Sequence, residues 1–449
     1  MLSHYDVLVA GCGCAGFCAA VEAARCGKRV ILIEKNDMPG GILTVGGNND
    51  IAQFFSEGVQ LIAGIGWEFC RRLEAVGGAV IPDMQAKDKP HPYYGVHVNI
   101  PLAAATMDEM LLEAGVEIHY GQVLCAAQTA ETPTGKRISS VLVTSKNGLR
   151  EIRASVYIDC TGDGDLSVFA GANYECGEET DGTTALQPGT VRYYPSVRAC
   201  DDATAARAGE ALRRAMNDGI LSPADMNAPD LRAVLSARGC NFNHISDTYS
   251  DDCDSRTAAD IAGRQCVKRI IGVLRDAGVT DVIETVAPET ALRETRRIVC
   301  DTKITAEDYV SARTYPDGVC HSYYLIDLHL SGKWSIRQQK LEKGKKPSIP
   351  LSAMTVSGID NLLVAGRCAW GDRLANSAYR VKASCMAMGQ ACGAAAALAS
   401  ETTGNHCGNT RSIDIARLRA LLAQHGCIVP PTAEDAPSED TVKVSEFHQ

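Results

Sequence analysis

The first 35 residues alternate between apolar runs and a segment of small residues. Residues 5–10 (YDVLVA) are almost entirely apolar, as expected for a strand that is buried on both faces of a parallel sheet. Glycine and alanine then recur along 15–24, which is typical of a helix that packs closely against a sheet, and Gly27 suits its C-terminal cap. Residues 29–34 (RVILIE) form a second apolar run. The pattern predicts a β-α-β unit.

The same reasoning predicts the elements of the remaining chain. Further helices are expected over 51–78, 102–115, 201–218, 256–277 and 381–399. The pattern over 116–158 is typical of strands, and Asn147-Gly148 is a strong hairpin signal. Apolar runs predict two more strands, over 322–330 and 361–367.

Composition and charge limit the possible functions. A chain of 449 residues with 45% hydrophobic and 22% charged residues is expected to form two or three globular domains. The formal charge of −10 disfavours a nucleic-acid partner, because phosphate binding needs a basic surface. No apolar run approaches the ~18 residues that span a membrane. Since the first strand begins by Tyr5, no signal peptide is expected, and we predict a cytoplasmic protein.

A glycine motif directly follows the first predicted strand. Gly11, Gly13 and Gly16 form a GxGxxG that opens the first helix, and Glu34 lies at the end of the second strand. In dinucleotide-binding folds such glycines allow a tight turn and a close backbone approach, the helix N-terminus faces the pyrophosphate, and the acidic residue binds the ribose. The context therefore predicts one dinucleotide site.

The cysteines raise the question of a metal or cluster site. The chain has 19, and four of them, Cys12, Cys14, Cys18 and Cys26, lie in or just behind the glycine motif. Their spacing does not match that of iron–sulfur or zinc-ribbon ligands, and a cluster would compete with phosphate for the same amides. We interpret them as small buried residues and predict no metal site.

Stretches spread over most of the chain resemble one known family. They include the glycine motif with its flanks (7–35), GGILTVGG (40–47), YIDCTGDGDLSVFAGANYECGEE (157–179), YYLIDLHLSG (323–332) and YRVKASCMAMGQACGAAAAL (379–398). They are similar to the FAD-dependent oxidoreductases related to the fumarate reductase and succinate dehydrogenase flavoproteins. The resemblance implies an α/β fold in which a Rossmann-like FAD-binding domain, a parallel sheet with a β-meander, contains an inserted α+β substrate or cap domain.

The resemblance also implies domain boundaries. The FAD-binding domain is expected over 1–180 and 345–428, the substrate or cap domain over 181–344, and a flexible C-terminal tail over 429–449. The covalent-flavin histidine context of the respiratory relatives is missing, so non-covalent FAD is expected.

Cofactor-binding residues follow from the same resemblance. The first loop is expected to face the pyrophosphate, Glu34 the adenosine ribose, and the helix that starts near Val381 the pyrimidine carbonyl of the flavin, where its positive end would stabilise reduced flavin. The full set implied is Gly11, Gly13, Cys14, Ala15, Gly16, Glu34, Lys35, Gly40, Gly41, Thr44, Thr161, Gly162, Gly366, Arg367, Val381 and Gly389.

Strand alternation suggests a substrate face. In 322–330 it places Tyr323, Leu325, Asp327 and His329 on one side. This pattern fits a solvated sheet face slightly better than a catalytic one, but the resemblance favours His329 and Asp327 as proton-transfer groups. His244, in the polar segment 241–247, is a weaker candidate.

A cluster of arginines is a second candidate. Arg293, Arg296 and Arg297 would share one face if the stretch ALRETRRI is helical. Such a cluster could bind a carboxylate, or it could be a solvated face paired with Glu289 or Glu294. The predicted catalytic set is therefore His329, Asp327, Arg293 and Tyr323.

These features predict an FAD-dependent oxidoreductase that transfers a hydride between flavin and a small organic substrate, by dehydrogenation or double-bond reduction. Alternatives are a flavin monooxygenase, an electron-transfer flavoprotein subunit similar to the heterodisulfide reductase flavoprotein, and a binding protein that retains FAD structurally. Because the glycine fingerprint occurs once, the expected electron partner is a redox protein, a quinone-like molecule or transiently bound NAD(P)H.

Overall fold

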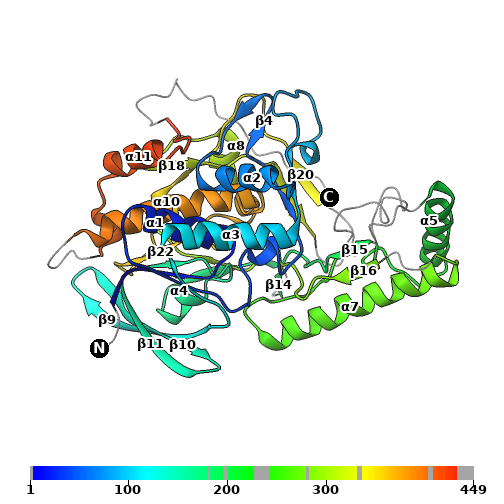
Figure 1. Ribbon diagram of the computed structural model, residues 1–449, viewed down its shortest axis with the longest axis horizontal. Helices are drawn as coiled ribbons and strands as arrows, with labels where there is room; N and C mark the ends of the chain where they lie inside the picture. Colours follow the sequence, from blue (N-terminus) through cyan, green and yellow to red (C-terminus); the bar gives the residue numbers. More distant parts are fainter. Residues whose placement is uncertain are drawn as a thin grey trace.

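The structure is a computed structural model that describes residues 4–180, 183–195, 201–226, 243–279, 283–330, 336–402 and 408–431. Its central sheet has the strand order β8-β2-β1-β11-β10-β9, and β22 pairs with β11 (Figure 1). In chain order these strands are β1 (His4–Ala10), β2 (Val30–Ile33), β8 (Glu117–His119), β9 (Val123–Thr132), β10 (Gly135–Ser145), β11 (Gly148–Asp159) and β22 (Leu362–Val364).

Strand β11 joins a parallel sheet to a β-meander. Its second half runs parallel to β1 and β22, whereas its first half pairs antiparallel with β10, which in turn pairs antiparallel with β9. Gly148 begins β11 with φ 89°, a conformation that glycine adopts without strain, and so forms the predicted hairpin with Asn147. The α/β fold and the parallel sheet with a β-meander are confirmed.

Two helices rich in small residues pack against each other beside the sheet. They are α1 (Cys14–Arg25) and α10 (Lys382–Ser400). A β-carbon at Gly389 would stand only 2.7 Å from the carbonyl carbon of Ala15, and one at Gly393 only 3.1 Å from that of Ala19. Helices α2 (Ile65–Ala75) and α3 (Ile100–Ala114) pack beside them, on the same side of the sheet (Figure 1).

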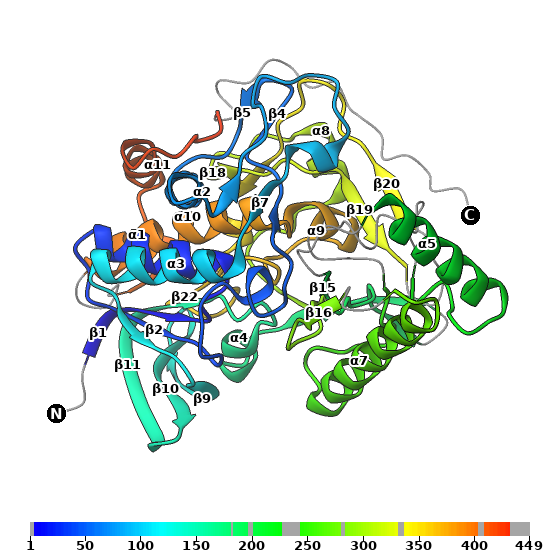
Figure 2. The ribbon, with the colours of Figure 1, turned by 45° about the vertical axis from the view of Figure 1, so that its right-hand side comes forward.

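A second unit lies to one side of the sheet. Its helices α5 (Asp202–Asn217) and α7 (Cys253–Asp276) pack against each other, near the strand pair β15 (Tyr193–Pro195) and β16 (Ile283–Val286) (Figure 2). Apolar residues between the two helices, among them Leu212 and Ile270, form a core that is separate from the one around the central sheet.

The remaining helices and strands are short. The helices are α4 (Asp165–Phe169), α8 (Ala306–Ser311), α9 (Arg373–Tyr379) and α11 (Ile415–Gln424). The paired strands are β3 (Asp50–Ile51) and β6 (Ala79–Val80) with β7 (Val96–Val98), β4 (Phe55–Ser56) with β5 (Val59–Gln60), β12 (Tyr174–Cys176) with β17 (Arg296–Ile298), β13 (Glu178–Thr180) with β14 (Thr183–Ala185), β18 (Gly318–His321) with β21 (Ser348–Pro350), and β19 (Ile326–His329) with β20 (Ile336–Gln339).

A buried carboxylate links several of these segments. Glu294 is fully buried; its carboxylate lies 2.9 Å from Arg297 and 2.9 Å from Arg373 of α9, and it accepts a hydrogen bond from the backbone N–H of Gln187 at 2.8 Å. A buried charge of this kind is tolerated because it is both paired and hydrogen-bonded.

The prediction of a helix over 51–78 is wrong in its first part. Residues 50–60 form the short strands β3, β4 and β5, and α2 begins only at Ile65. Glu57, Gly58 and Gly64 adopt positive φ angles of 52°, 78° and 75°, which are incompatible with a continuous right-handed helix. The other predicted helices are present as α3, α5, α7 and α10.

The predicted domain boundaries remain a prediction, and most of the predicted tail, 432–449, lies outside the described residues. Among the described residues, no helix combines the length and the apolar character that crossing a membrane requires.

Candidate active site

A cavity of about 700 Å³ lies at the carboxyl ends of the parallel strands. Its walls come from the loops after β1, β2, β11 and β22, from the start of α10, and from α7, β19 and the segment 289–293. Open α/β sheets bind ligands at this edge. Twelve predicted cofactor residues line the cavity: Gly13, Cys14, Ala15, Glu34, Lys35, Gly40, Gly41, Thr161, Gly162, Gly366, Arg367 and Val381.

The glycines of the first loop have different tasks. Gly11 turns the chain with φ 92° and donates to the carbonyl of Ile33 at 2.8 Å. Gly16 lets α1 approach this turn, because a β-carbon there would stand 2.9 Å from the carbonyl carbon of Gly11. A β-carbon at Gly13, by contrast, would meet no protein atom within 4 Å. Gly13 thus opens the N-terminus of α1 toward the cavity, whereas Gly11 and Gly16 only shape the loop.

Glu34 holds this loop together. Its carboxylate accepts hydrogen bonds from the backbone N–H of Cys12 at 2.6 Å and of Asn36 at 2.9 Å. Burial raises the pKa of Glu34, and the two amide donors oppose that effect. The neighbouring Lys35 forms an ion pair with Glu289 at 3.1 Å across the cavity wall.

The loop at 40–44 approaches the phosphate loop from the other side. Gly40, with φ 104°, donates to the carbonyl of Cys12 at 2.7 Å, and a β-carbon at Gly41 would stand 3.2 Å from the α-carbon of Gly13. Thr44 is buried and its hydroxyl donates to the carbonyl of Pro39, so it supports the loop without lining the cavity.

Asp163 organises the wall after β11. Its carboxylate forms ion pairs with Arg367 at 2.5 Å and with Arg256 of α7 at 3.1 Å. Arg367 also donates a hydrogen bond to the carbonyl of Gly162 at 3.0 Å. Burial alone would raise the pKa of Asp163, but the two guanidinium groups lower it. This ion-pair group connects the loops of the sheet to the second unit.

The N-terminus of α10 also opens into the cavity. Its N-cap residue, Val381, provides no side-chain cap, and Lys382 and Cys385 line the wall with it. Burial, and after it the neighbouring Arg192, lowers the pKa of Lys382 to about 8, despite the opposing effect of the thiol of Cys14. Gly389 lies deeper in α10, against α1, and does not line the cavity.

His329 lies on the cavity wall beyond α10, between two partners. Its Nε2 is 3.3 Å from Oδ2 of Asp327, and its Nδ1 is 3.1 Å from Nε2 of His244. Asp327 also accepts from Gln338 at 2.8 Å, and its backbone carbonyl accepts from Arg380 at 3.2 Å. All three members of the group Asp327, His329 and His244 are buried.

The surroundings fix the charges in this group. Burial lowers the pKa of His329 to about 4, helped by the nearby charge of Arg293. Burial would raise the pKa of Asp327, but the hydrogen bond to His329 and the charge of Arg380 hold it below its usual range. Near neutral pH, His329 is therefore neutral and Asp327 ionised.

Arg293 reaches the same wall, but the predicted arginine cluster is not formed. The segment 292–298 is not helical; it bends and then enters β17. Arg296 pairs with Asp251 and Asp165, while Arg297 points to Glu294. Because successive strand residues point to opposite faces, the three arginines cannot share one surface.

Tyr323 is also misplaced by the prediction, because the strand begins only at Ile326. Before it, the hydroxyl of Tyr309 donates to the carbonyl of Tyr324 at 3.0 Å and accepts from its N–H at 3.1 Å. These bonds occupy backbone groups that a longer strand would use. Tyr324, rather than Tyr323, lines the cavity.

Sequence reasoning missed several wall residues. Arg380 and Lys382 flank the predicted residue Val381. Their place at the start of a predicted helix could have indicated them. His244, the weaker candidate of the sequence, does not line the cavity itself, and no local signal pairs it with His329, because the two residues meet only through the fold.

Comparison with known proteins identifies the family. A sequence model of the family described as "FAD dependent oxidoreductase" matches residues 6–422. The chain belongs to this family. It is accordingly an enzyme, and FAD is its cofactor. Among curated proteins, no significant match to the chain was found.

Solved structures are similar to this chain only at low identity and low TM-score. A geranylgeranyl bacteriochlorophyll reductase-like protein from Thermoplasma acidophilum is 12% identical with a TM-score of 0.41, over 94% of this chain and 84% of that one. An anhydrotetracycline hydroxylase from Streptomyces rimosus is 16% identical with a TM-score of 0.35, over 67% of this chain and 55% of that one. Similarities of this size do not identify the reaction.

The cavity fits FAD on its own evidence. Gly13 leaves space where a β-carbon would stand, and the uncapped N-termini of α1 and α10 both face the cavity. Helix N-termini favour anionic groups such as the pyrophosphate. The Nε atom of Arg380 is buried and has no hydrogen-bond partner among the described residues, which also suits an anionic ligand.

Proposed function

We propose that this enzyme transfers a hydride between FAD and a small organic substrate, by dehydrogenation or double-bond reduction. We further propose that His329 and Asp327 move the accompanying proton. The observation that supports this most directly is the hydrogen-bonded group Asp327, His329 and His244, of which Asp327 and His329 lie on the wall of the cavity. FAD, when bound, supplies the hydride donor or acceptor. The resemblance to fumarate reductase flavoproteins is consistent with this reaction class.

The hydrogen-bond pattern implies where the proton resides. An ionised carboxylate can only accept, so Asp327 orients His329 with its proton on Nε2. Nδ1 of His329 then accepts from Nε2 of His244. The 3.3 Å distance to Asp327 is long for a hydrogen bond, so a substrate atom could replace the carboxylate as acceptor. When His329 gives up its proton from Nε2, His244 can supply a proton to Nδ1 of His329.

The charges beside this group favour an anionic substrate. Arg293 and Arg380 lie on the same wall as His329, and guanidinium groups bind carboxylates through paired hydrogen bonds. We expect the substrate to carry a carboxylate that Arg293 and Arg380 orient toward the flavin. The electron partner, a redox protein or NAD(P)H, remains a prediction.

The test uses the flavin-loaded enzyme, reduced anaerobically with dithionite. It is mixed with a panel of α,β-unsaturated mono- and dicarboxylic acids, and flavin reoxidation is followed by stopped-flow absorbance. We expect at least one acid to reoxidise the flavin, and His329→Gln to slow this step by about 10²- to 10⁴-fold. His119→Gln, a half-buried histidine on β8 outside the cavity, is the matched control and should not change the rate.

Two results would contradict the proposal. A wild-type rate in His329→Gln would remove this residue from proton transfer. If none of the acids reoxidises the flavin, but O₂ does so and one of its oxygen atoms is incorporated into an added substrate, the enzyme is a monooxygenase.

A further inference from the structure

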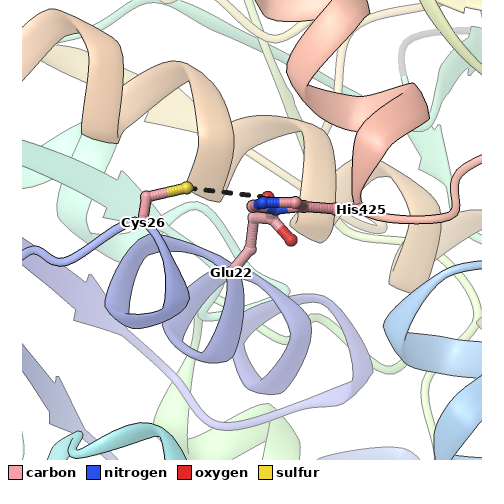
Figure 3. Close-up of side chains that lie close together, drawn as sticks. All are labelled: Glu22, Cys26 and His425. Carbon is pink, nitrogen blue, oxygen red and sulfur yellow. Dashed lines mark hydrogen bonds and ion pairs between the residues drawn. The ribbon is translucent and has the colours of Figure 1, made fainter.

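A second group of reactive side chains lies outside the flavin cavity. Glu22 and Cys26 are one turn apart at the end of α1, and His425 immediately follows α11 (Figure 3). One possible ligand atom from each residue lies within 4.8 Å of the other two. A carboxylate, a thiol and an imidazole are the side chains that bind Zn²⁺ in proteins.

The carboxylate is held in a fixed orientation. Glu22 is fully buried, and its Oε2 accepts from Nε2 of Gln390 at 2.8 Å. The side-chain oxygen of Gln390 accepts from the N–H of Ile65 at 2.8 Å, so its amide group can present only its nitrogen to Glu22. Oε1 of Glu22 therefore faces Cys26 at 3.7 Å and His425 at 2.6 Å. Outer partners of this kind orient metal ligands.

The position favours a cation. Cys26 is the C-cap residue of α1 and His425 that of α11, so two helices end at the group, and helix C-termini carry partial negative charge. Glu22 forms an ion pair with His425 only when the imidazole of His425 is protonated. Cys26 and His425 are half-buried, so an ion can reach the group from solvent.

We propose that Glu22, Cys26 and His425 bind one Zn²⁺ ion that fastens α11 to α1. Tetrahedral coordination at the usual bond lengths separates sulfur from oxygen by about 3.5 Å and nitrogen from oxygen by about 3.3 Å. The Sγ–Oε1 distance of 3.7 Å is already close to this value, and His425 has to move about 0.7 Å from its 2.6 Å hydrogen bond. On binding, the thiol proton of Cys26 is released to solvent, and water takes the fourth position.

The proposed site has no part in the flavin reaction, because α1 separates it from the flavin cavity. The helix has 12 residues, and at about 1.5 Å per residue its two ends are roughly 18 Å apart. The flavin reaction therefore plays no part in the test below, and the proposal does not depend on the proposed function.

The test titrates chelator-treated, flavin-loaded enzyme with Zn²⁺ against a competing indicator. We expect one ion per chain, and binding at least tenfold weaker in Cys26→Ser and in His425→Gln. Cys125→Ser is the matched control, because Cys125 is an exposed thiol on β9 outside the group. Absence of stoichiometric binding to the wild type, or equal binding by all four proteins, would overturn the proposal.

A second measurement does not depend on how well Cys26→Ser and His425→Gln fold. Co²⁺ is added to the wild-type enzyme, and the spectrum of the metal-free enzyme at equal flavin content is subtracted. A thiolate-to-cobalt charge-transfer band is expected, and it should persist in Cys125→Ser. A difference spectrum without this band would show that Cys26 is not a ligand and that the group is a hydrogen-bonded ion pair only.

Discussion

Replacing Gly389 by alanine tests how tightly α1 and α10 pack. The new β-carbon would stand 2.7 Å from the carbonyl carbon of Ala15, whereas non-bonded carbon atoms approach to about 3.5 Å. The carbonyl oxygen of Ala15 would be closer still, so the two helices would have to separate locally by more than about 0.8 Å. Overpacking of this kind costs about 1–3 kcal/mol.

The expected effect on the melting temperature follows from the size of the chain. At about 2.1 cal/mol/K per residue, cooperative unfolding of the whole chain has an entropy of about 0.9 kcal/mol/K. The Gly389→Ala variant should then melt about 1–3 °C below the wild type in differential scanning fluorimetry of flavin-free protein. The decrease is larger if the sheet and its helices unfold as a smaller unit.

Gly13→Ala is the matched control, since the same methyl group is added to a glycine of the loop that precedes α1. Gly13 has φ −72° and an empty space beside it. The free energy of unfolding of the flavin-free variant should therefore lie within about 0.5 kcal/mol of that of the wild type. The methyl group would instead enter the space for the cofactor, and a cost of about 1–3 kcal/mol weakens FAD binding by roughly 5- to 150-fold.

FAD affinity is measured by the quenching of flavin fluorescence during titration of the flavin-free protein. Unchanged melting of Gly389→Ala would refute the close packing of the two helices. Wild-type FAD affinity in Gly13→Ala would refute the assignment of the open side of Gly13 to the cofactor.

Three further predictions concern buried charges. Glu294→Gln leaves buried arginines without their carboxylate and should lower the free energy of unfolding in urea by about 3–5 kcal/mol, whereas Glu210→Gln, at an exposed ion pair, should change it by at most about 1 kcal/mol. Burial lowers the pKa of His329 to about 4 and that of His244 to about 3, against about 6.5 in the unfolded chain. Their contribution to stability is thus complete above pH 6.5 and decreases as the pH falls, and the urea midpoint of His244→Gln should depend less on pH between 7 and 5 than that of the wild type. Because the pKa of Lys382 in the flavin-free protein is lowered to about 8, FAD affinity should weaken as the pH rises above 8. Lys382→Arg, which keeps its charge, should show a smaller pH dependence, and equal slopes would exclude Lys382 as the titrating group.

The parts of the fold that depend on neighbouring residues were predictable. The β-α-β unit, the hairpin at Asn147-Gly148 and the small-residue helix α10 each result from a pattern within about 30 residues. The same holds for the glycine motif, because Gly11, Gly13 and Gly16 act through backbone geometry that their spacing already specifies.

The substrate end of the cavity was predictable only in part. Asp327 and His329 share one face of β19, as strand alternation requires. Tyr323 fails because Tyr309, from another helix, takes the backbone bonds that would extend the strand. His244 was only a weaker candidate, because its contact with His329 depends on how the second unit packs against the sheet.

The cationic side chains at the two ends of the cavity have different surroundings. This difference indicates at which end an anionic ligand binds. At the end near α7, Asp163 lies between Arg256 and Arg367, so the chain supplies the negative charge itself. Around the N-terminus of α10, by contrast, burial is the largest cause that lowers the pKa of Lys382 and of Arg380. A cation whose pKa is lowered is destabilised in its charged form, and a nearby anion reverses that effect. In a protein of net charge −10, cations kept at this position are best explained by the negative charge that reduced flavin and the proposed carboxylate substrate would bring to it.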